Sequence, residues 1–255
     1  MKCEMRKKDL YWVFAVCFIM LSSCLGDSNT RITVGEQEAV YQVRPSRGLV
    51  LSGGRLIYSS SINSLRADAG DCFMVQYSFD TSNPELQKTD SLSVELLGEP
   101  TEVPLWTLEG TVPSDTLLTD EQYIAKIGTR TPYIKGRLFL WPQLNEPESQ
   151  RDSFVMHYDS VNLYKTTDGF RTYNLYLRAI RKSEIPADAD STLVPHTEAF
   201  DIESFFNKAL EMETANQSKT LTIAVNYVAK PNKDTTAVEW SVLELNYDLE
   251  NGTEE

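Results

Sequence analysis

Short apolar segments separated by turn residues recur along most of the chain. In the first half these segments are rich in Val, Leu, Tyr and Phe, and Gly53-Gly54, Asn83-Pro84 and Gly98-Glu99-Pro100 lie between them. Segments of this kind, bounded by glycine, proline and aspartate, are typical of β-strands. The predicted strands are Glu38–Val43, Gly48–Tyr58, Cys72–Phe79, Ser91–Leu97 and Val103–Leu108. Five short strands with glycine-rich turns favour a small closed or nearly closed barrel.

The second half adds a clear alternation of apolar and other positions. Between residues 219 and 228, Leu221, Ile223, Val225 and Tyr227 alternate with polar or small residues. This alternation is expected when one face of a strand is buried and the other is wet. It is typical of antiparallel sandwiches. The predicted strands are Tyr133–Trp141, Ser153–Tyr164, Arg171–Ile180, Lys219–Val228 and Val238–Tyr247.

A polar stretch between residues 110 and 130 divides the two groups of strands. It contains Pro113, Ser114 and Asp120, and its strand signal is weak. A chain of this length is expected to form one large or two small domains. We therefore predict an all-β protein, with a barrel domain at 24–112 and an antiparallel β-sandwich domain at 130–250.

One segment of the second half has a helical period. Apolar residues recur at i, i+3, i+4, i+7 and i+8 from Ile202 to Leu210, directly after Asp201. Aspartate is a favoured helix N-cap residue. The pattern predicts one amphipathic helix over 202–212 that packs on a sheet edge or barrel mouth. The alternative is a helix that displays its apolar face to a partner.

The N-terminus resembles a bacterial lipoprotein signal. Cationic residues at positions 2 to 8 precede the apolar run Leu10–Leu21, and Leu21-Ser22-Ser23-Cys24 follows. The apolar run is too short for a comfortable membrane span. We predict that the signal peptide 1–23 is removed and that Cys24 is lipidated. The protein is then attached to the membrane through this lipid anchor. Leu25 stands at the position where an aspartate is linked with inner-membrane retention in some bacteria, and this favours the outer membrane. The sequence does not distinguish the periplasmic face of that membrane from the surface face.

The charge of the mature chain excludes one class of partner. Without residues 1–23, 20 Lys and Arg stand against 35 Asp and Glu, a net charge of −15. A nucleic-acid binder needs a basic face to neutralise phosphates. We therefore predict no nucleic-acid partner.

Several segments together resemble the NigD-like lipoproteins of Bacteroidetes. They are the lipobox, the strand Gly70-Asp71-Cys72-Phe73-Met74-Val75-Gln76-Tyr77 followed by Leu92–Leu97, the strand Tyr133–Trp141 and the strand Leu221–Val228. The resemblance implies an N-terminal OB-like small barrel and a C-terminal β-sandwich. That family is named from a bacteriocin gene cluster and has no agreed activity or catalytic residues, so the resemblance transfers no role to any position here.

No catalytic constellation emerges from the sequence. The mature chain holds two histidines, and His157-Tyr158-Asp159-Ser160 has the residue types of a hydrolase triad. Neighbouring side chains of a strand point to opposite faces, so these groups are not expected to converge. His196 follows Pro195 and is interpreted as a surface histidine. We predict no enzyme activity, no catalytic residue and no cofactor.

Two further features of the sequence bear on metal and redox chemistry. Asp188 and Asp190 could begin a calcium loop, but its glycine and distal glutamate are missing, so no metal site is predicted. Cys72 lies in a strand and is interpreted as a buried, inert thiol.

Candidate surface sites are an aromatic residue and a repeated dipeptide. Trp106, flanked by Pro104 and Leu105, is the aromatic that could face a ligand, although tryptophan usually packs in a core. Asp followed by Ser or Thr is similar to the O-glycosylation acceptor motif of Bacteroidetes, and it is also common in turns. The hydroxyl residues of these motifs are Ser91, Thr116, Ser160, Ser191 and Thr235.

Two classes of function remain open. The first is a non-enzymatic cell-envelope lipoprotein that binds or scaffolds an unknown envelope protein or glycan, bacteriocin-related by family analogy. The second is a glycan-binding accessory lipoprotein of a nutrient-uptake system. An exposed row of aromatic residues would favour the second class, whereas a charged surface with a modest apolar patch would favour the first.

Overall fold

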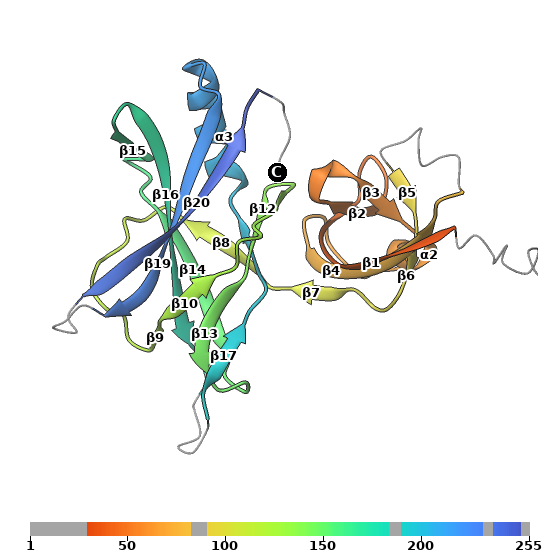
Figure 1. Cartoon of the computed structure of the whole chain (residues 1–255), viewed down its shortest axis with the longest axis horizontal. Coiled ribbons are helices and arrows are strands. Elements are labelled where there is room, and N and C mark those ends of the chain that lie inside the picture. The colour runs from red at the N-terminus through yellow and green to blue at the C-terminus, as the bar shows by residue number, and fades with distance from the viewer. Residues whose placement is uncertain (1–29, 83–90, 184–189, 232–236, 251–255) are drawn as a thin grey trace, which may run out of the picture.

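The computed structural model describes residues 30–82, 91–183, 190–231 and 237–250, and it is an all-β protein in two parts (Figure 1). The predicted signal peptide and Cys24 lie outside the described residues. Within those residues, no helix has the length and apolar character needed to cross a membrane.

The smaller part is one curled sheet, a half-barrel around its own core (Figure 1). Its strand order is β5-β3-β2-β1-β4-β6, with β7 paired to β4. The elements are β1 (Arg31–Gln42), β2 (Gly48–Leu51), the 3-10 turn η1 (Ser52–Gly54), β3 (Leu56–Tyr58), the single helical turn α2 (Ser60–Asn63), β4 (Cys72–Asp80), β5 (Ser91–Ser93), β6 (Glu95–Leu96) and β7 (Thr101–Val103).

The larger part is a sandwich of a ten-stranded and a three-stranded sheet. The ten-stranded sheet has the order β11-β12-β18-β8-β14-β16-β19-β20, with β9 and β15 paired to β16, and the small sheet has the order β10-β13-β17. The elements are β8 (Leu105–Glu109), β9 (Glu121–Gln122), β10 (Ile124–Ile127), β11 (Tyr133–Ile134), β12 (Arg137–Leu140), β13 (Pro142–Glu146), β14 (Asp152–Tyr158), β15 (Tyr164–Thr167), β16 (Phe170–Arg181), β17 (Thr192–Pro195), β18 (Glu198–Asp201), α3 (Glu203–Ala215), β19 (Thr220–Pro231) and β20 (Val238–Asp248).

The large sheet is mixed, which differs from the predicted antiparallel sandwich. β8 runs parallel to both β14 and β18, and β16 runs parallel to β19. The parallel pair β16 and β19 is reached through a crossover that contains α3, because parallel neighbours need a long connection. Alternation within one strand reports which face is buried and carries no information on the direction of the neighbour.

The chain passes between the two parts at Pro104, not within residues 110–130. β7 pairs with β4 of the half-barrel, whereas β8 begins one residue after Pro104 and lies between β18 and β14. Residues 105–127, including β9 and β10, therefore belong to the larger part. The sequence of a five-residue strand such as β8 does not indicate which sheet the strand joins. The polar stretch at 110–130 therefore did not mark the boundary between the two parts.

The two parts share a small apolar interface. On β1 and β2, Ala39 and Leu49 face the core of the half-barrel, whereas Val40 and Val50 point to the opposite side. There they pack with residues of the larger part, among them Phe139. Because side chains alternate along a strand, one face of β1 and β2 packs in the core of the half-barrel. The opposite face packs against the larger part.

The predicted helix is confirmed as α3, which begins at Glu203 and extends to Ala215. Phe205, Phe206 and Ala209 are buried, so its apolar stripe covers the core. Asp201 lies one residue before the observed cap position, where its Oδ1 accepts the Glu203 amide at 3.3 Å.

Candidate functional site

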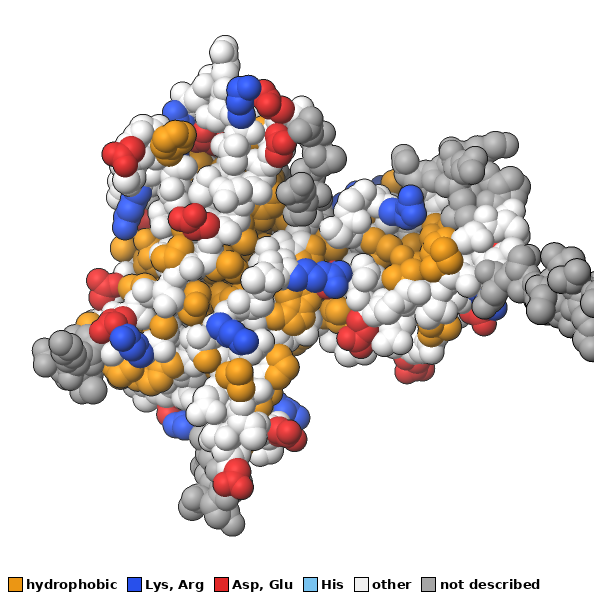
Figure 2. Space-filling view, viewed as in Figure 1, with side chains coloured by type: hydrophobic (Ala, Val, Ile, Leu, Met, Phe, Trp, Pro, Cys, Tyr) orange, Lys and Arg blue, Asp and Glu red, His pale blue; other side chains and the backbone are white. Residues whose placement is uncertain are grey.

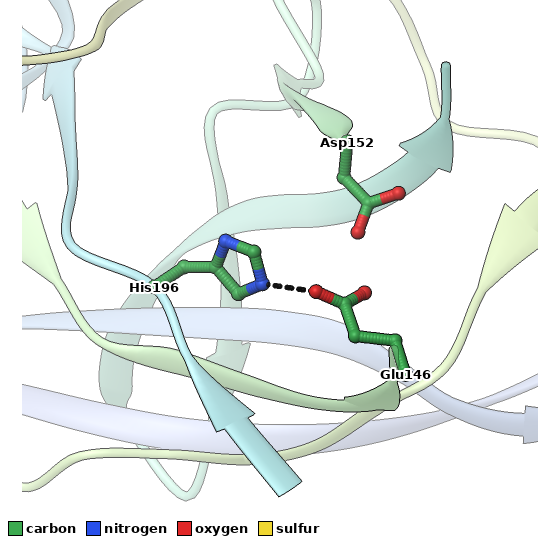
Figure 3. A group of neighbouring side chains, drawn as sticks. All are labelled: Glu146, Asp152 and His196. Carbon is green, nitrogen blue, oxygen red and sulfur yellow. Dashed lines mark hydrogen bonds and ion pairs between the residues drawn. The ribbon is translucent and has the colours of Figure 1, made fainter. Parts of the chain in front are cut away.

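A polar cluster lies inside the larger part, where β13, β14 and the connection from β17 to β18 meet. Glu146 is the last residue of β13, Asp152 is the first of β14, and His196 follows β17. The three side chains point toward one another (Figure 3). They come from segments separated by 44 residues between Asp152 and His196, and the fold brings them together.

The local structure explains how these positions converge. On β13, Pro142, Leu144 and Glu146 share the buried face, so a carboxylate occupies a position where an apolar side chain is usual. The His196 amide donates to the Pro142 carbonyl at 2.9 Å, which holds the connection beside β13. A turn closed by the Gln150 amide and the Pro147 carbonyl, also at 2.9 Å, returns the chain to β14.

Hydrogen bonds link the members of the cluster. His196 Nε2 lies 2.6 Å from Glu146 Oε1. The side-chain amide nitrogen of Gln150 donates to Glu146 Oε2 at 2.8 Å and to Asp152 Oδ1 at 3.0 Å. Gln150 is 4% exposed, and its Oε1 is buried without a hydrogen-bond partner. Each buried acceptor left without a partner carries a desolvation cost.

A third carboxylate, that of Glu198 in β18, borders the cluster. Its Oε2 accepts the indole N–H of Trp106 at 2.6 Å, and its Oε1 lies 3.9 Å from His196 Nδ1. The ring of Phe154 packs edge-on against the His196 imidazole at a centroid distance of 5.5 Å. The imidazole is therefore held between two carboxylates and an aromatic wall.

Burial favours the uncharged forms of these groups. Loss of solvent, followed by the hydrogen bond and the charge of Asp152, raises the pKa of Glu146 to about 8. Loss of solvent also raises the pKa of Glu198 to about 7 and lowers the pKa of His196. We therefore interpret the 2.6 Å contact of Glu146 with His196 at neutral pH as a hydrogen bond between a protonated carboxyl and a neutral imidazole.

The cluster has the composition of a cation site. One ligand atom each from Glu146, Asp152 and His196 can be chosen so that all three lie within 4.8 Å of one another. Imidazole nitrogen and carboxylate oxygen are common ligands of divalent metal ions in proteins. The arrangement could bind such an ion or share protons among its members.

Sequence reasoning missed this cluster and misplaced His196. The side chain of His196 is 17% exposed and hydrogen-bonded, so the interpretation as a surface histidine is wrong. The available signal was a glutamate on the apolar face of a strand, at Glu146 and again at Glu198 beside Ala199 and Phe200.

The buried thiol is confirmed. Cys72 is 1% exposed in the interface between the two parts, and burial raises the pKa of its thiol to about 12. A thiol that stays protonated and inaccessible is a poor nucleophile.

The His157 to Ser160 segment does not assemble a triad. His157 Nδ1 lies 2.8 Å from Thr111 Oγ1, and Ser160 Oγ donates to the Gly110 carbonyl. The Asp159 carboxylate accepts from Val161 and Asn162 in a local turn. Each group is committed to a separate partner.

The remaining sequence candidates are distributed over the molecule. Trp106 is half-buried against the main core and bonded to Glu198, so its indole contributes to the cluster instead of forming an open platform. Among the acceptor-like positions, Thr116, Ser160 and Ser191 are exposed and Ser91 is half-buried in β5. Thr235 and Asp188 lie outside the described residues, and Asp190 is exposed.

Comparisons with known proteins show a shared fold without a close sequence relative. No protein-family model matches the chain, and no curated protein matches it in sequence. An uncharacterized protein from Parabacteroides merdae superposes with a TM-score of 0.70 at 18% identity, covering 84% of this chain and 98% of that chain. A candidate lipoprotein from Bacteroides fragilis superposes with a TM-score of 0.53 at 14% identity, covering 86% and 98%.

A NigD-like immunity protein from Bacteroides caccae gives a TM-score of 0.46 at 13% identity, covering 86% of this chain and 97% of that chain. The Parabacteroides merdae and Bacteroides fragilis structures share the fold of this chain. Both match along nearly their whole length, so the two-part architecture recurs in Bacteroidetes proteins. The all-β class that the resemblance to NigD-like lipoproteins implied is confirmed by the structure.

Proposed function

We propose that this chain is a non-enzymatic lipoprotein of the cell envelope that binds or scaffolds a partner protein. The order Leu21-Ser22-Ser23-Cys24 supports lipid attachment, and Leu25 after the cysteine supports the outer membrane. The described fold begins at residue 30, a few residues beyond the proposed anchor. A structure with the same fold from Bacteroides fragilis is described as a candidate lipoprotein.

The surface chemistry favours a protein partner over a sugar. Among the described residues, Phe170 is the one aromatic side chain that is exposed, at 78%. The other exposed large hydrophobic residues are aliphatic, and Val161 and Val242 are examples. On the face shown in Figure 2, hydrophobic side chains gather over the smaller part and beside the junction, with charges scattered between them. Sugar-binding faces commonly use flat aromatic rings, and this surface offers mainly aliphatic contacts.

The resemblance to NigD-like lipoproteins supports a bacteriocin-related partner. The glycan-binding accessory role remains the second candidate, and Trp106 is the observation that favours it. The indole of Trp106 is partly exposed, so part of the ring could contact a sugar while its N–H stays bonded to the buried Glu198.

Lipidation is tested by replacing the proposed acylation site. We expect cells fed a labelled fatty acid to label the wild-type chain and not Cys24→Ala, because the thiol of Cys24 is the attachment atom. The labelled wild type should fractionate with the outer membrane. Cys72→Ala is the matched control and should keep the label, since Cys72 is buried. Label retained on Cys24→Ala would contradict the anchor.

The partner class is tested by crosslinking and by polysaccharide binding. Crosslinking in the native envelope should capture a protein that mass spectrometry identifies, and capture should be lost when the Cys24→Ala chain is mislocalised. Affinity electrophoresis in gels containing envelope and dietary polysaccharides should leave the mobility unchanged. Retardation that Trp106→Ala abolishes would instead establish the glycan-binding role.

A further inference from the structure

The buried glutamates of this protein fall into two groups. Five glutamates are buried among the described residues, and they are Glu38, Glu121, Glu146, Glu198 and Glu213. Three of them have an arginine within ion-pair distance: Glu38 with Arg130, Glu121 with Arg178, and Glu213 with Arg171. The remaining two, Glu146 and Glu198, are both members of the cluster around His196.

The cluster therefore lacks the cation that the other buried carboxylates have. In the described part of the chain, the ion-pair contacts of Glu146 and Glu198 are to His196 alone, and Asp152 has none. Three neighbouring carboxylates and one imidazole would carry a large uncompensated negative charge if ionised. Burying such charge is expensive unless a cation is bound. A bound positive charge would compensate these groups in their ionised form, as an arginine does for the other three buried glutamates.

Gln150 supplies an independent observation. Its amide nitrogen is bonded to both Glu146 and Asp152, so its amide group lies against the cluster. Its Oε1 is buried and has no hydrogen-bond partner. The two ends of a side-chain amide are assigned from their hydrogen bonds, and a half-turn would direct this oxygen at the same carboxylates. That orientation loses the hydrogen bonds from the amide nitrogen to Glu146 and Asp152, and a cation bound between the carboxylates would supply a partner for the oxygen in their place.

We propose that Glu146, Asp152 and His196, supported by Glu198 and Gln150, bind one divalent first-row transition-metal ion, for which Zn²⁺ is the best-fitting member. Ligand atoms of one zinc ion lie about 2.0–2.2 Å from it, and therefore at most about 4.4 Å from each other. The ligand atoms here lie within 4.8 Å. Small side-chain rotations bring them onto a common centre, and the ion displaces the hydrogen bond between Glu146 and His196.

The donor set indicates the class of ion. One imidazole nitrogen with carboxylate oxygens and no thiolate suits Zn²⁺, whereas Mg²⁺ and Ca²⁺ prefer oxygen alone. The indole N–H of Trp106 donates to Glu198, and the ring of Phe154 packs on the imidazole of His196. Such outer contacts orient metal ligands. The ion would tie β13, β14 and the connection from β17 to β18, and this role goes beyond the proposed partner binding.

The test uses the full lipidated chain, purified in detergent and stripped of metal with a chelator. Calorimetric titration with Zn²⁺ should show one ion per chain, and Zn²⁺ should raise the melting temperature. Substitution with Co²⁺ should give visible absorption bands of a nitrogen and oxygen site. His196→Asn should weaken Zn²⁺ binding by more than about 100-fold, because it removes the nitrogen ligand.

The matched control is His157→Asn, which removes the other histidine of the mature chain and should bind Zn²⁺ as the wild type does. Circular dichroism verifies folding, and Asp152→Asn, at the partly exposed edge of the cluster, replaces His196→Asn if that variant does not fold. A wild-type chain without saturable zinc binding, or zinc binding unchanged in the folded cluster variant, overturns the site. Preference for Mg²⁺ or Ca²⁺ overturns the assignment to a transition metal.

Discussion

Replacing Phe206 by alanine is expected to lower the free energy of unfolding by about 3–5 kcal/mol, because it removes a buried ring and leaves a cavity. Phe206 is 7% exposed and belongs to the buried face of α3. Its ring stacks on Tyr133 at a centroid distance of 4.1 Å and meets Tyr247 edge-on at 5.0 Å. Both contacts add to the apolar area that the ring buries.

Urea unfolding, monitored by tryptophan fluorescence, measures this loss of stability in the larger part, to which Phe206 belongs. The described tryptophans, Trp106, Trp141 and Trp240, all lie in the larger part. Phe170→Ala is the control, since Phe170 is 78% exposed and its loss should change the stability by less than about 0.5 kcal/mol. A similarly small effect for Phe206→Ala would contradict core packing and make α3 a candidate partner surface.

Replacing Arg178 by methionine is expected to cost about 3–5 kcal/mol, because it leaves a buried carboxylate without its cation. Arg178 is 1% exposed, and its Nη1 lies 3.4 Å from Glu121 Oε1. The guanidinium also donates to the carbonyls of Ser114 and Thr116. Methionine fills similar space but satisfies neither the carboxylate nor the carbonyls.

The loss should depend on pH in a defined direction. Burial raises the pKa of Glu121, and the charge of Arg178 opposes that rise. Without Arg178 the folded-state pKa of Glu121 rises further, so ionisation opposes folding more strongly as the pH increases. Urea unfolding should therefore show a smaller loss at pH 5 than at pH 8.

Two variants isolate the role of the buried pair. Arg181→Met removes the partly exposed partner of the exposed Asp120 and should cost less than about 1 kcal/mol. Adding Glu121→Leu to Arg178→Met should restore part of the stability, since no buried charge is then left unpaired. Equal losses for Arg178→Met and Arg181→Met would contradict the structural role of the buried pair.

Local pattern was sufficient to predict most of the elements. Alternation from Leu221 to Tyr227 predicted β19, and the 3.6-residue period from Ile202 to Leu210 predicted α3. Both signals depend on which face of one element is buried, and burial of one face is encoded by neighbouring residues of the same segment. The buried state of Cys72 followed from the same local logic.

Sheet membership depended on contacts between distant segments. β8 was assigned to the first part, yet it joins the larger sheet between β18 and β14. Its five residues alternate in the same way whichever sheet they enter. The direction of the neighbouring strand is likewise absent from the alternation, and the mixed sheet follows from the crossover through α3.

By itself, the sequence determined the all-β class, the places of most strands, the helix and the lipoprotein-like N-terminus, since each depends on residues close together in the chain. Only the tertiary structure decided the boundary at Pro104, the strand directions and the cluster of Glu146, Asp152 and His196. These three residues look unremarkable where they stand in the sequence, and their chemistry arises when the fold brings them together in a low-dielectric interior. There the missing arginine, which no local pattern can reveal, sets this cluster apart from the other buried glutamates.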